Sequence, residues 1–217
     1  NMNENTEKLT IKRILIYVMG ILFVSLGIVL CKKCGMGISP ISSIPFVLMY
    51  ITPLTFGTLT TLFHLINTLL QMLMTRKFSD IKLWLQIPLA FVFGLVIDFF
   101  NILITIDDTV LMYRIFALIF SIFFTALGMV CMLGMNLIQN PPDGTVKQIS
   151  VLLNKELSSI KIGYDITCVV LSVLLGLLFL QKIKGLGIAT IASAIFVGKS
   201  IHWIQPVLNP FFGKKIQ

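Results

Sequence analysis

The sequence predicts an all-α fold: a polytopic membrane helical bundle of about six transmembrane helices, arranged as two inverted three-helix repeats, each with a short extra helix. Three observations lead to this prediction. Of the 217 residues, 57% are hydrophobic and only 12% are charged, with a mean hydropathy of +0.97, whereas soluble domains average about 45–50% apolar and 25% charged residues. Long apolar runs recur along the chain, and its two halves carry matching landmarks.

The apolar runs are long enough to cross a bilayer, because a spanning helix needs about 20 mostly apolar residues. Within a single membrane domain of residues 1–217, we expect spans near 13–33, 54–74, 83–105, 114–137, 162–181 and 186–207. Each run is continuous, unlike the alternating ten-residue strands of a membrane barrel. Helices are therefore the expected elements, since lipid offers the backbone no other hydrogen-bond partners.

The formal net charge of +8 does not indicate nucleic-acid binding. Basic residues stand singly or in pairs between apolar runs, as at helix ends facing lipid headgroups, and they form no basic stripe. With a cytoplasmic N-terminus, eleven Lys and Arg residues fall in cytoplasmic segments and five in outside segments, leaving Lys199 inside the last span. This bias predicts that both termini are cytoplasmic. The first apolar run has no A-x-A-like site after it, so we expect a retained span.

Internal repetition divides the chain into a first repeat, 13–105, and a second repeat, 114–207. A shift of 101 residues places Pro40 on Pro141 and Ser42 on Asp143, a shift of 106 places Gly57 on Gly163, and a shift of 104 places Gly94 on Gly198 and Asp98 on His202. Each repeat holds three spans, so the second copy must enter the membrane from the opposite side. Such inverted repeats are typical of secondary transporters.

A short proline-led connector lies between the first two spans of each repeat, at 40–50 and at 140–159. Proline followed by a small polar residue is a helix-start signal, with Ser42 or Asp143 available to cap free amides. In the second connector, Ile149, Leu152 and Leu157 share one helical face with further apolar residues up to Ile160. An interfacial helix and a re-entrant helix both remain open.

Several short motifs carry a resemblance: Leu26-Gly27, the run Gly35-Met36-Gly37-Ile38-Ser39-Pro40-Ile41-Ser42, Asn140-Pro141-Pro142-Asp143-Gly144, and Lys184-Gly185-Leu186-Gly187-Ile188-Ala189-Thr190. With these motifs the chain resembles the YczE/YitT-like bacterial membrane proteins, and within them the YczE branch. The resemblance implies a small multi-pass protein of the bacterial cytoplasmic (inner) membrane, from a family of largely unassigned function that is often discussed as transporters and implies no firm substrate. That family's loop usually reads proline, any residue, aspartate. Asp143 keeps the acid while Ser42 replaces it, which argues against a symmetric two-acid site.

Polar residues inside the apolar runs are candidates for function, since a charged side chain at the centre of a spanning helix costs about 2.5–3.5 kcal/mol on insertion scales. His64 and Asn67 share one face with Gln71. Asp98 and His202 hold matching repeat positions, so we expect both to point inward as a proton relay, or as a structural bond between helices worth about 1 kcal/mol. The candidate substrate-binding residues are Pro40, Ser42, Ser43, His64, Asn67, Asp98, Asn101, Asn140, Asp143, Lys199 and His202.

No motif indicates an enzyme, a cofactor or a metal site. Cys31 and Cys34 have C-x-x-C spacing, but no second pair or nearby histidine accompanies them in sequence. No Walker loop or nucleophile motif is present. Ala194 and Gly198, four residues apart, are expected to let two helices approach closely.

These observations favour a transporter or flippase-like carrier for a small polar solute, with ion or proton coupling compatible with the polar residues. The alternative is a non-transporting membrane scaffold or accessory subunit of a biosynthetic complex, and an intramembrane enzyme is the third reading. A lipid-facing polar stripe would favour the scaffold. The expected partners are the lipid bilayer and a small polar solute; a homodimer is compatible with the sequence, and nucleic acid is not expected.

Overall fold

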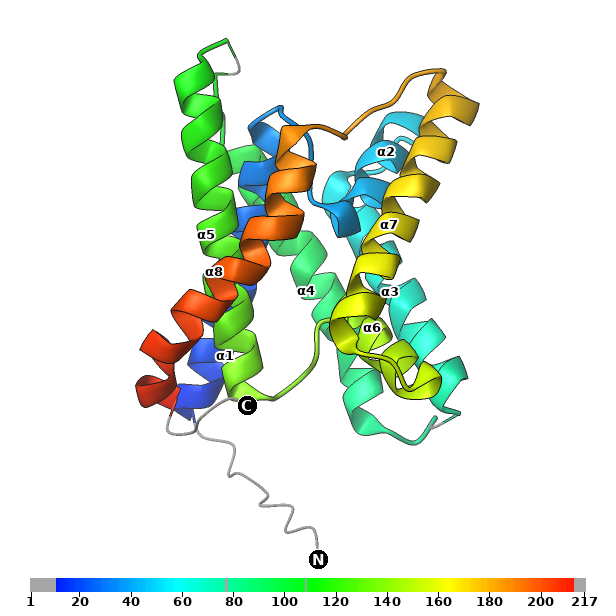
Figure 1. Ribbon diagram of the computed structural model, residues 1–217, viewed down its shortest axis with the longest axis vertical. Coiled ribbons are helices and arrows are strands. Elements are labelled where there is room, and N and C mark those ends of the chain that lie inside the picture. Colours follow the sequence, from blue (N-terminus) through cyan, green and yellow to red (C-terminus); the bar gives the residue numbers. More distant parts are fainter. Residues whose placement is uncertain (1–10, 77, 108, 213–217) are drawn as a thin grey trace, which may run out of the picture.

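In the computed structural model, which describes residues 11–76, 78–107 and 109–212, every regular element is a helix. The elements in chain order, shown in Figure 1, are α1 (Ile11–Lys33), the 3₁₀ turn η1 (Pro40–Ser42), α2 (Ser43–Ile51), α3 (Phe56–Thr75), α4 (Ile81–Leu103), α5 (Leu111–Met135), α6 (Pro141–Leu153), α7 (Leu157–Leu175), the π-helical turn η2 (Gly176–Leu180) and α8 (Ile188–Phe212).

Four of these helices are long and apolar enough to cross a membrane: α1, α4, α5, and α7 with its π-helical end. Apolar side chains cover their outer surfaces; Leu95 and Ile102 on α4 are 72% and 82% exposed. The other two long helices, α3 and α8, do not meet the same measure. α3 carries His64, Asn67 and Gln71 within its length. The chain is thus a membrane protein, as its composition predicts.

The segment from α6 to α7 departs from the sequence prediction. Asn154 adopts a left-handed conformation (φ 49°) and ends α6 at Leu153, a position at which asparagine is tolerated. α7 then begins at Leu157, earlier than the expected 162. The predicted single apolar face up to Ile160 is therefore wrong, because the chain turns inside it and divides its residues between two helices.

The pair α1 and α5 forms an extensive and close helix crossing. A Cβ on Gly27 would lie 2.8 Å from the Ser121 carbonyl oxygen, and one on Gly128 would lie 2.6 Å from the Gly20 carbonyl oxygen. Backbones in such close contact leave no room for larger side chains, so small residues are required at the crossing.

Arginine side chains close both ends of this pair. Arg114 at the start of α5 donates from Nε to the Cys34 carbonyl oxygen just after α1, at 2.9 Å. Arg13 at the start of α1 donates from Nη2 to the Met135 carbonyl oxygen at the end of α5. The last carbonyls of a helix lack partners within it and carry partial negative charge, so a guanidinium suits each end.

The helices of the molecule form two groups joined through α4. In Figure 1, α1, α5 and α8 lie on one side and α2, α3, α6 and α7 on the other. α8 packs on α5, while α3 packs on α6 and α2 packs on α7. α4 contacts α1 in the first group and α3 in the second. The start of α1 and the end of α8 lie at the same end of the view.

Candidate functional site

The polar face of α3 is buried, as the spacing of its residues predicts. His64, Asn67 and Gln71 are 4%, 1% and 2% exposed. Gln71 and Gln86 of α4 exchange two side-chain hydrogen bonds, Nε2 to Oε1, of 3.0 and 3.2 Å. Reciprocal amide bonds satisfy polar groups that would otherwise be costly to bury.

The second connector docks directly on this face. Gln71 Nε2 also donates to the Pro141 carbonyl oxygen, at 2.9 Å, and the Thr145 hydroxyl donates to the Asn67 carbonyl oxygen, at 3.2 Å. A Cβ on Gly144 would overlap the Gln71 side chain, so glycine is needed for this approach. α6 thus begins against the middle helix of the first half.

α7 completes the surroundings of α6. The Tyr164 hydroxyl donates to Asn67 Oδ1 at 2.7 Å. Lys161 Nζ lies 3.0 Å from Asp165 Oδ1 and 3.7 Å from Asp143 Oδ1, so one ammonium stands between two carboxylates. We call the following set the polar cluster: His64, Asn67, Gln71, Gln86, Asn140, Asp143, Thr145, Lys161, Tyr164 and Asp165.

Two buried atoms of the polar cluster have no hydrogen-bond partner in the described part of the chain: His64 Nδ1 and Asn140 Oδ1. The His64 ring instead meets Phe93 edge-on, with 5.4 Å between ring centroids. Unpaired buried polar atoms are uncommon and costly. They are the groups of the cluster whose hydrogen-bonding capacity is unused in the described residues.

The first connector docks on the other half in a similar way. Ser43 is fully buried, and its hydroxyl contacts the carbonyl oxygens of Pro40, at 2.6 Å, and of Cys168 in α7, at 3.2 Å. Thr145 makes a similar pair of contacts, to the carbonyl oxygens of Pro141 and of Asn67. Each connector therefore bonds its own proline carbonyl and a middle-helix carbonyl of the opposite half.

The predicted capping by Ser42 and Asp143 is wrong. The Ser42 hydroxyl accepts from Ser39 Oγ, and Asp143 Oδ2 accepts from Asn140 Nδ2 at 3.0 Å. Neither side chain bonds an amide at a helix start. Both first turns begin with proline, which has no amide hydrogen to cap at that position.

Asp98 and Asn101 lie apart from the polar cluster. The Asp98 carboxylate accepts from the Thr55 hydroxyl and from the Gly57 amide, 2.8 Å away, and so caps the start of α3. Asn101 Oδ1 accepts from Lys32 Nζ at 2.7 Å. These contacts tie the end of α4 to α1 and α3.

The expected meeting of Asp98 with His202 is wrong in this structure. His202 is exposed on α8, where Lys199 is exposed too and lies over the Phe196 ring, 5.7 Å from its centroid. The inward orientation fails because the buried residues of α8, Ala189, Thr190 and Ser193, lie on a different side of the helix from His202. By the criterion of an exposed polar stripe, these two residues count toward a scaffold.

Several residues of the polar cluster escaped the sequence prediction: Gln86, Lys161 and Tyr164. Gln86 stands alone in an apolar run, and no periodic signal marks it. Lys161, Tyr164 and Asp165 fall within two turns at the start of α7, and their spacing of three and four residues was a usable signal.

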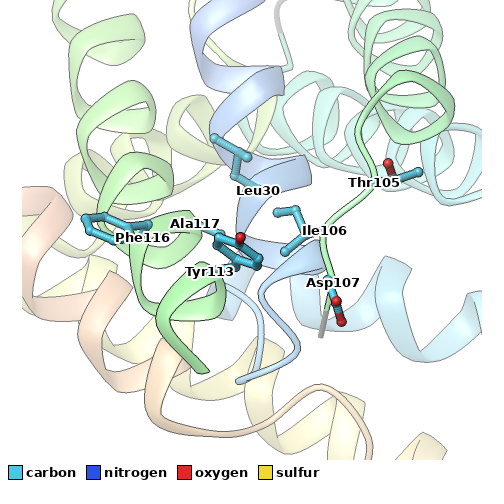
Figure 2. A pocket seen from close by; sticks show the side chains of 7 residues that line it. All are labelled: Leu30, Thr105, Ile106, Asp107, Tyr113, Phe116 and Ala117. Carbon is cyan, nitrogen blue, oxygen red and sulfur yellow. The ribbon is translucent and has the colours of Figure 1, made fainter. Parts of the chain in front are cut away.

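A separate pocket of about 370 Å³ lies beside the connection of α4 to α5 (Figure 2). Its lining is mostly apolar and contains none of the predicted site residues: Leu30, Thr105, Ile106, Asp107, Tyr113, Phe116 and Ala117. At its rim the Thr109 hydroxyl and amide both donate to Asp107 Oδ1, and the hydroxyl bond lowers the pKa of this exposed carboxyl below its usual value.

The four cysteines Cys31, Cys34, Cys131 and Cys168 are buried and free. In the described ranges, no three side chains of His, Cys, Asp or Glu stand close enough together to hold a metal ion.

Comparison with known proteins identifies a family but no activity. The profile of a family of unknown function, DUF6198, matches residues 11–206. No curated protein and no solved structure matches the chain.

Proposed function

Because the chain belongs to DUF6198, a family of unknown function, its activity must be argued from its own residues, and we propose that it is a six-span membrane carrier for a small polar solute. In this proposal α3 and α8 also cross the bilayer. The polar residues of α3 are buried against other helices and so kept from lipid, and those of α8 take part in function. The chain comprises two inverted repeats, 13–105 and 114–207, in the cytoplasmic membrane of a bacterium.

Matched contacts support the inverted repeat. Arg13 and Arg114 differ by 101 residues, as do their acceptors Cys34 and Met135. At the α1–α5 crossing, Gly27 and Gly128 differ by the same number, and so do Gly20 and Ser121, whose carbonyls they approach. A twofold axis through this crossing would exchange both pairs of contacts, which is the expectation for two copies of opposite orientation.

The crosswise docking of the connectors is the observation that carries the function. Ser43 of the first half bonds α7, and Thr145 of the second half bonds α3. In carriers with inverted repeats, substrate sites lie where helix starts from each repeat meet the other. Here the start of the second connector meets α3 and α7 at the polar cluster, which includes the unpaired His64 Nδ1 and Asn140 Oδ1.

The polar cluster favours a solute with both hydrogen-bonding and charged groups. Asp143, Lys161 and Asp165 offer one positive and two negative side chains, so a charged group can replace one partner of an existing ion pair. The amides of Asn67 and Asn140 offer further donors and acceptors. Ion or proton coupling fits the same residues.

A thermal-shift screen tests this function. Purified protein is heated with a library of small polar metabolites, including amino acids, polyamines, nucleosides and organic acids. A ligand at a hundredfold excess over its dissociation constant should add about 2.7 kcal/mol to the free energy of unfolding. Positive compounds are then assayed for uptake into proteoliposomes.

Paired variants separate a site from a general effect. Asp143→Asn removes one charge from the polar cluster and should abolish both ligand stabilisation and uptake. Asp107→Asn is the matched control, since Asp107 lies exposed in the α4–α5 connection and outside the cluster. Equal losses in both variants, or full activity in Asp143→Asn, would contradict the assignment of the site.

The scaffold alternative rests on one observation, the exposed Lys199 and His202 of α8. A scaffold predicts that a partner protein co-purifies with the chain and that Lys199→Gln together with His202→Gln releases this partner. Uptake of a solute by the purified protein alone would rule out a purely accessory role.

A further inference from the structure

α3 and α4 meet through a surface of small residues. Gly57 and Gly94 are in contact: a Cβ on Gly94 would lie 2.7 Å from the Gly57 carbonyl oxygen. One turn along α3, the Thr61 hydroxyl lies within hydrogen-bonding distance of two carbonyl oxygens. One is that of Gly57 in the same helix, at 3.1 Å, and the other is that of Ala90 in α4, at 3.2 Å. Asp98, one turn after Gly94, caps the start of α3. The two helices are joined closely along this line.

α7 and α8 carry the same residues in the same register. The shift of 106 residues that places Gly57 on Gly163 also places Thr61 on Thr167. The shift of 104 that places Gly94 on Gly198 also places Ala90 on Ala194. Four positions of the α3–α4 contact thus recur with identical residue types, although the two halves otherwise share little identity.

In the second half this surface is open. A Cβ on Gly163 or on Gly198 would meet no atom within 4 Å. Gly163, Thr167, Ala194 and Gly198 are all exposed. The Thr167 hydroxyl donates to the Gly163 carbonyl, at 2.8 Å, and makes no bond to α8 in the described residues. Figure 1 shows α7 and α8 standing apart, joined by the connector from 181 to 187.

Small residues on a membrane helix matter when another helix lies on them. They let backbones approach, whereas against lipid they bury less surface than larger side chains do. The expectation from sequence that Ala194 and Gly198 permit a close helix contact is unmet in this conformation. The corresponding contact of the first half, between α3 and α4, is closed in the same structure.

We propose that the chain has a second conformation in which α7 closes on α8 through Gly163, Thr167, Ala194 and Gly198, as α3 is closed on α4 here. This inference rests on the inverted repeat of the proposed function and supplies its second state. The described conformation then has one helix pair closed and its counterpart open, which is the asymmetry that alternating access requires.

The hinge for this movement lies at the end of α7 and in the connector that follows it. α7 ends in the π-helical turn 176–180, and such turns are frequent at functional sites. Gln181 follows with φ 54° and Gly185 with φ 80°, so neither helix continues into the connector. Hinges are typically a few residues at element ends that absorb backbone rotation.

Closure of α7 on α8 would also move His202 from its exposed position into contact with the polar cluster. In the first half, the Asp98 carboxylate accepts a hydrogen bond from the Thr55 hydroxyl. The shift of 106 residues places Thr55 on Lys161, and the shift of 104 places Asp98 on His202. α8 would therefore bring His202 to Lys161, which already bonds Asp165 and Asp143. The exposed imidazole of the described conformation becomes part of the polar cluster in the second one.

Cross-linking tests the closure without knowledge of the substrate. All four native cysteines are replaced, a protease site is placed in the connector at 181–187, and Thr167→Cys is combined with Ala194→Cys. After mild oxidation in membranes and proteolysis, a bond between α7 and α8 keeps the two fragments together on a non-reducing gel. Thr61→Cys with Ala90→Cys, and a protease site in the α3–α4 loop, is the positive control.

Ile166→Cys with Ala194→Cys is the matched negative control. Ile166 is exposed like Thr167 and lies next to it, but points about 100° away around the helix. We expect cross-linking of the Thr167–Ala194 pair at least fivefold above this control. Adding Gly198→Leu should return it to the control level without loss of thermal stability, since that position has open space.

Two results would overturn the inference. One is cross-linking of Thr167–Ala194 no greater than the control while Thr61–Ala90 links efficiently. The other is a bond that forms only between two chains, seen as a dimer before proteolysis, because the open surface would then belong to a homodimer contact. Either result leaves ligand binding at the polar cluster testable by thermal shift, so the two proposals fail separately.

Discussion

Gly94 and Gly198, which the 104-residue sequence shift places on each other, have opposite surroundings. Gly94 is buried, and a Cβ there would overlap the Thr61 hydroxyl and approach the Gly57 carbonyl oxygen to 2.7 Å. Gly198 faces open space. The same residue type therefore supports a packed contact in one half and an unused surface in the other.

Alanine at these glycines should separate the two situations. Gly94→Ala should destabilise the protein by about 1–3 kcal/mol, because overpacking forces the two helices apart. Gly198→Ala should leave stability within about 0.5 kcal/mol of the original value. Thermal unfolding of both variants in the same detergent measures the difference, and equal unfolding temperatures would contradict the described α3–α4 contact.

At the scale of single residues, the sequence predicts part of the site. The shared face of His64, Asn67 and Gln71 follows from a spacing of three and four residues, and all three are buried. The pairing of Asp98 with His202 fails for a physical reason. Matching repeats identifies equivalent positions, but it does not reveal which of two equivalent interfaces is closed in a given conformation.

Among the elements, the helices follow closely from hydrophobicity and the turns less so. α1, α3, α4 and α5 begin and end within three residues of the apolar runs that predict them. α7 extends to Leu157 because its first turns are polar yet still helical, which a hydropathy limit misses. The turn η1 before α2 starts at Pro40 and α6 starts at Pro141, as expected, but Asn154 ends α6 by a left-handed turn that periodicity alone does not reveal.

The arginine bridges between α1 and α5 were not anticipated as a pair, although their separation of 101 residues equals the repeat shift. We expect Arg13→Gln and Arg114→Gln to destabilise the protein by similar amounts, about 1–2 kcal/mol each, since each leaves a helix-end carbonyl without its charged donor. Lys82→Gln is the control, because Lys82 is exposed on α4. Chemical unfolding in detergent measures all three, and a neutral effect at both arginines would remove this support for the repeat.

For the whole molecule, the repeat shifts of the sequence pair α1 with α5, α2 with α6, α3 with α7 and α4 with α8. One group of helices holds α1, α5 and α8, the other holds α2, α3, α6 and α7, and α4 joins them. The groups are joined through α3 and α4, and the equivalent junction of α7 with α8 is open. We propose that the carrier changes state by changing which of these two junctions is closed.

The proposed carrier requires six membrane crossings in two halves of opposite orientation. The side of the membrane from which introduced cysteines can be labelled measures these crossings most directly. Single cysteines replace Ile11, Ser79, Thr109, Lys182 and Lys214 in turn, and an impermeant maleimide is applied to right-side-out and inside-out vesicles. The native cysteines are buried, so the unsubstituted chain gives the background. We expect labelling at 11, 79 and 214 from the cytoplasmic face and at 109 and 182 from the outer face. Opposite sides for 11 and 79, or the same side for 182 and 214, would mean that α3 or α8 does not cross, which would contradict the inverted repeat.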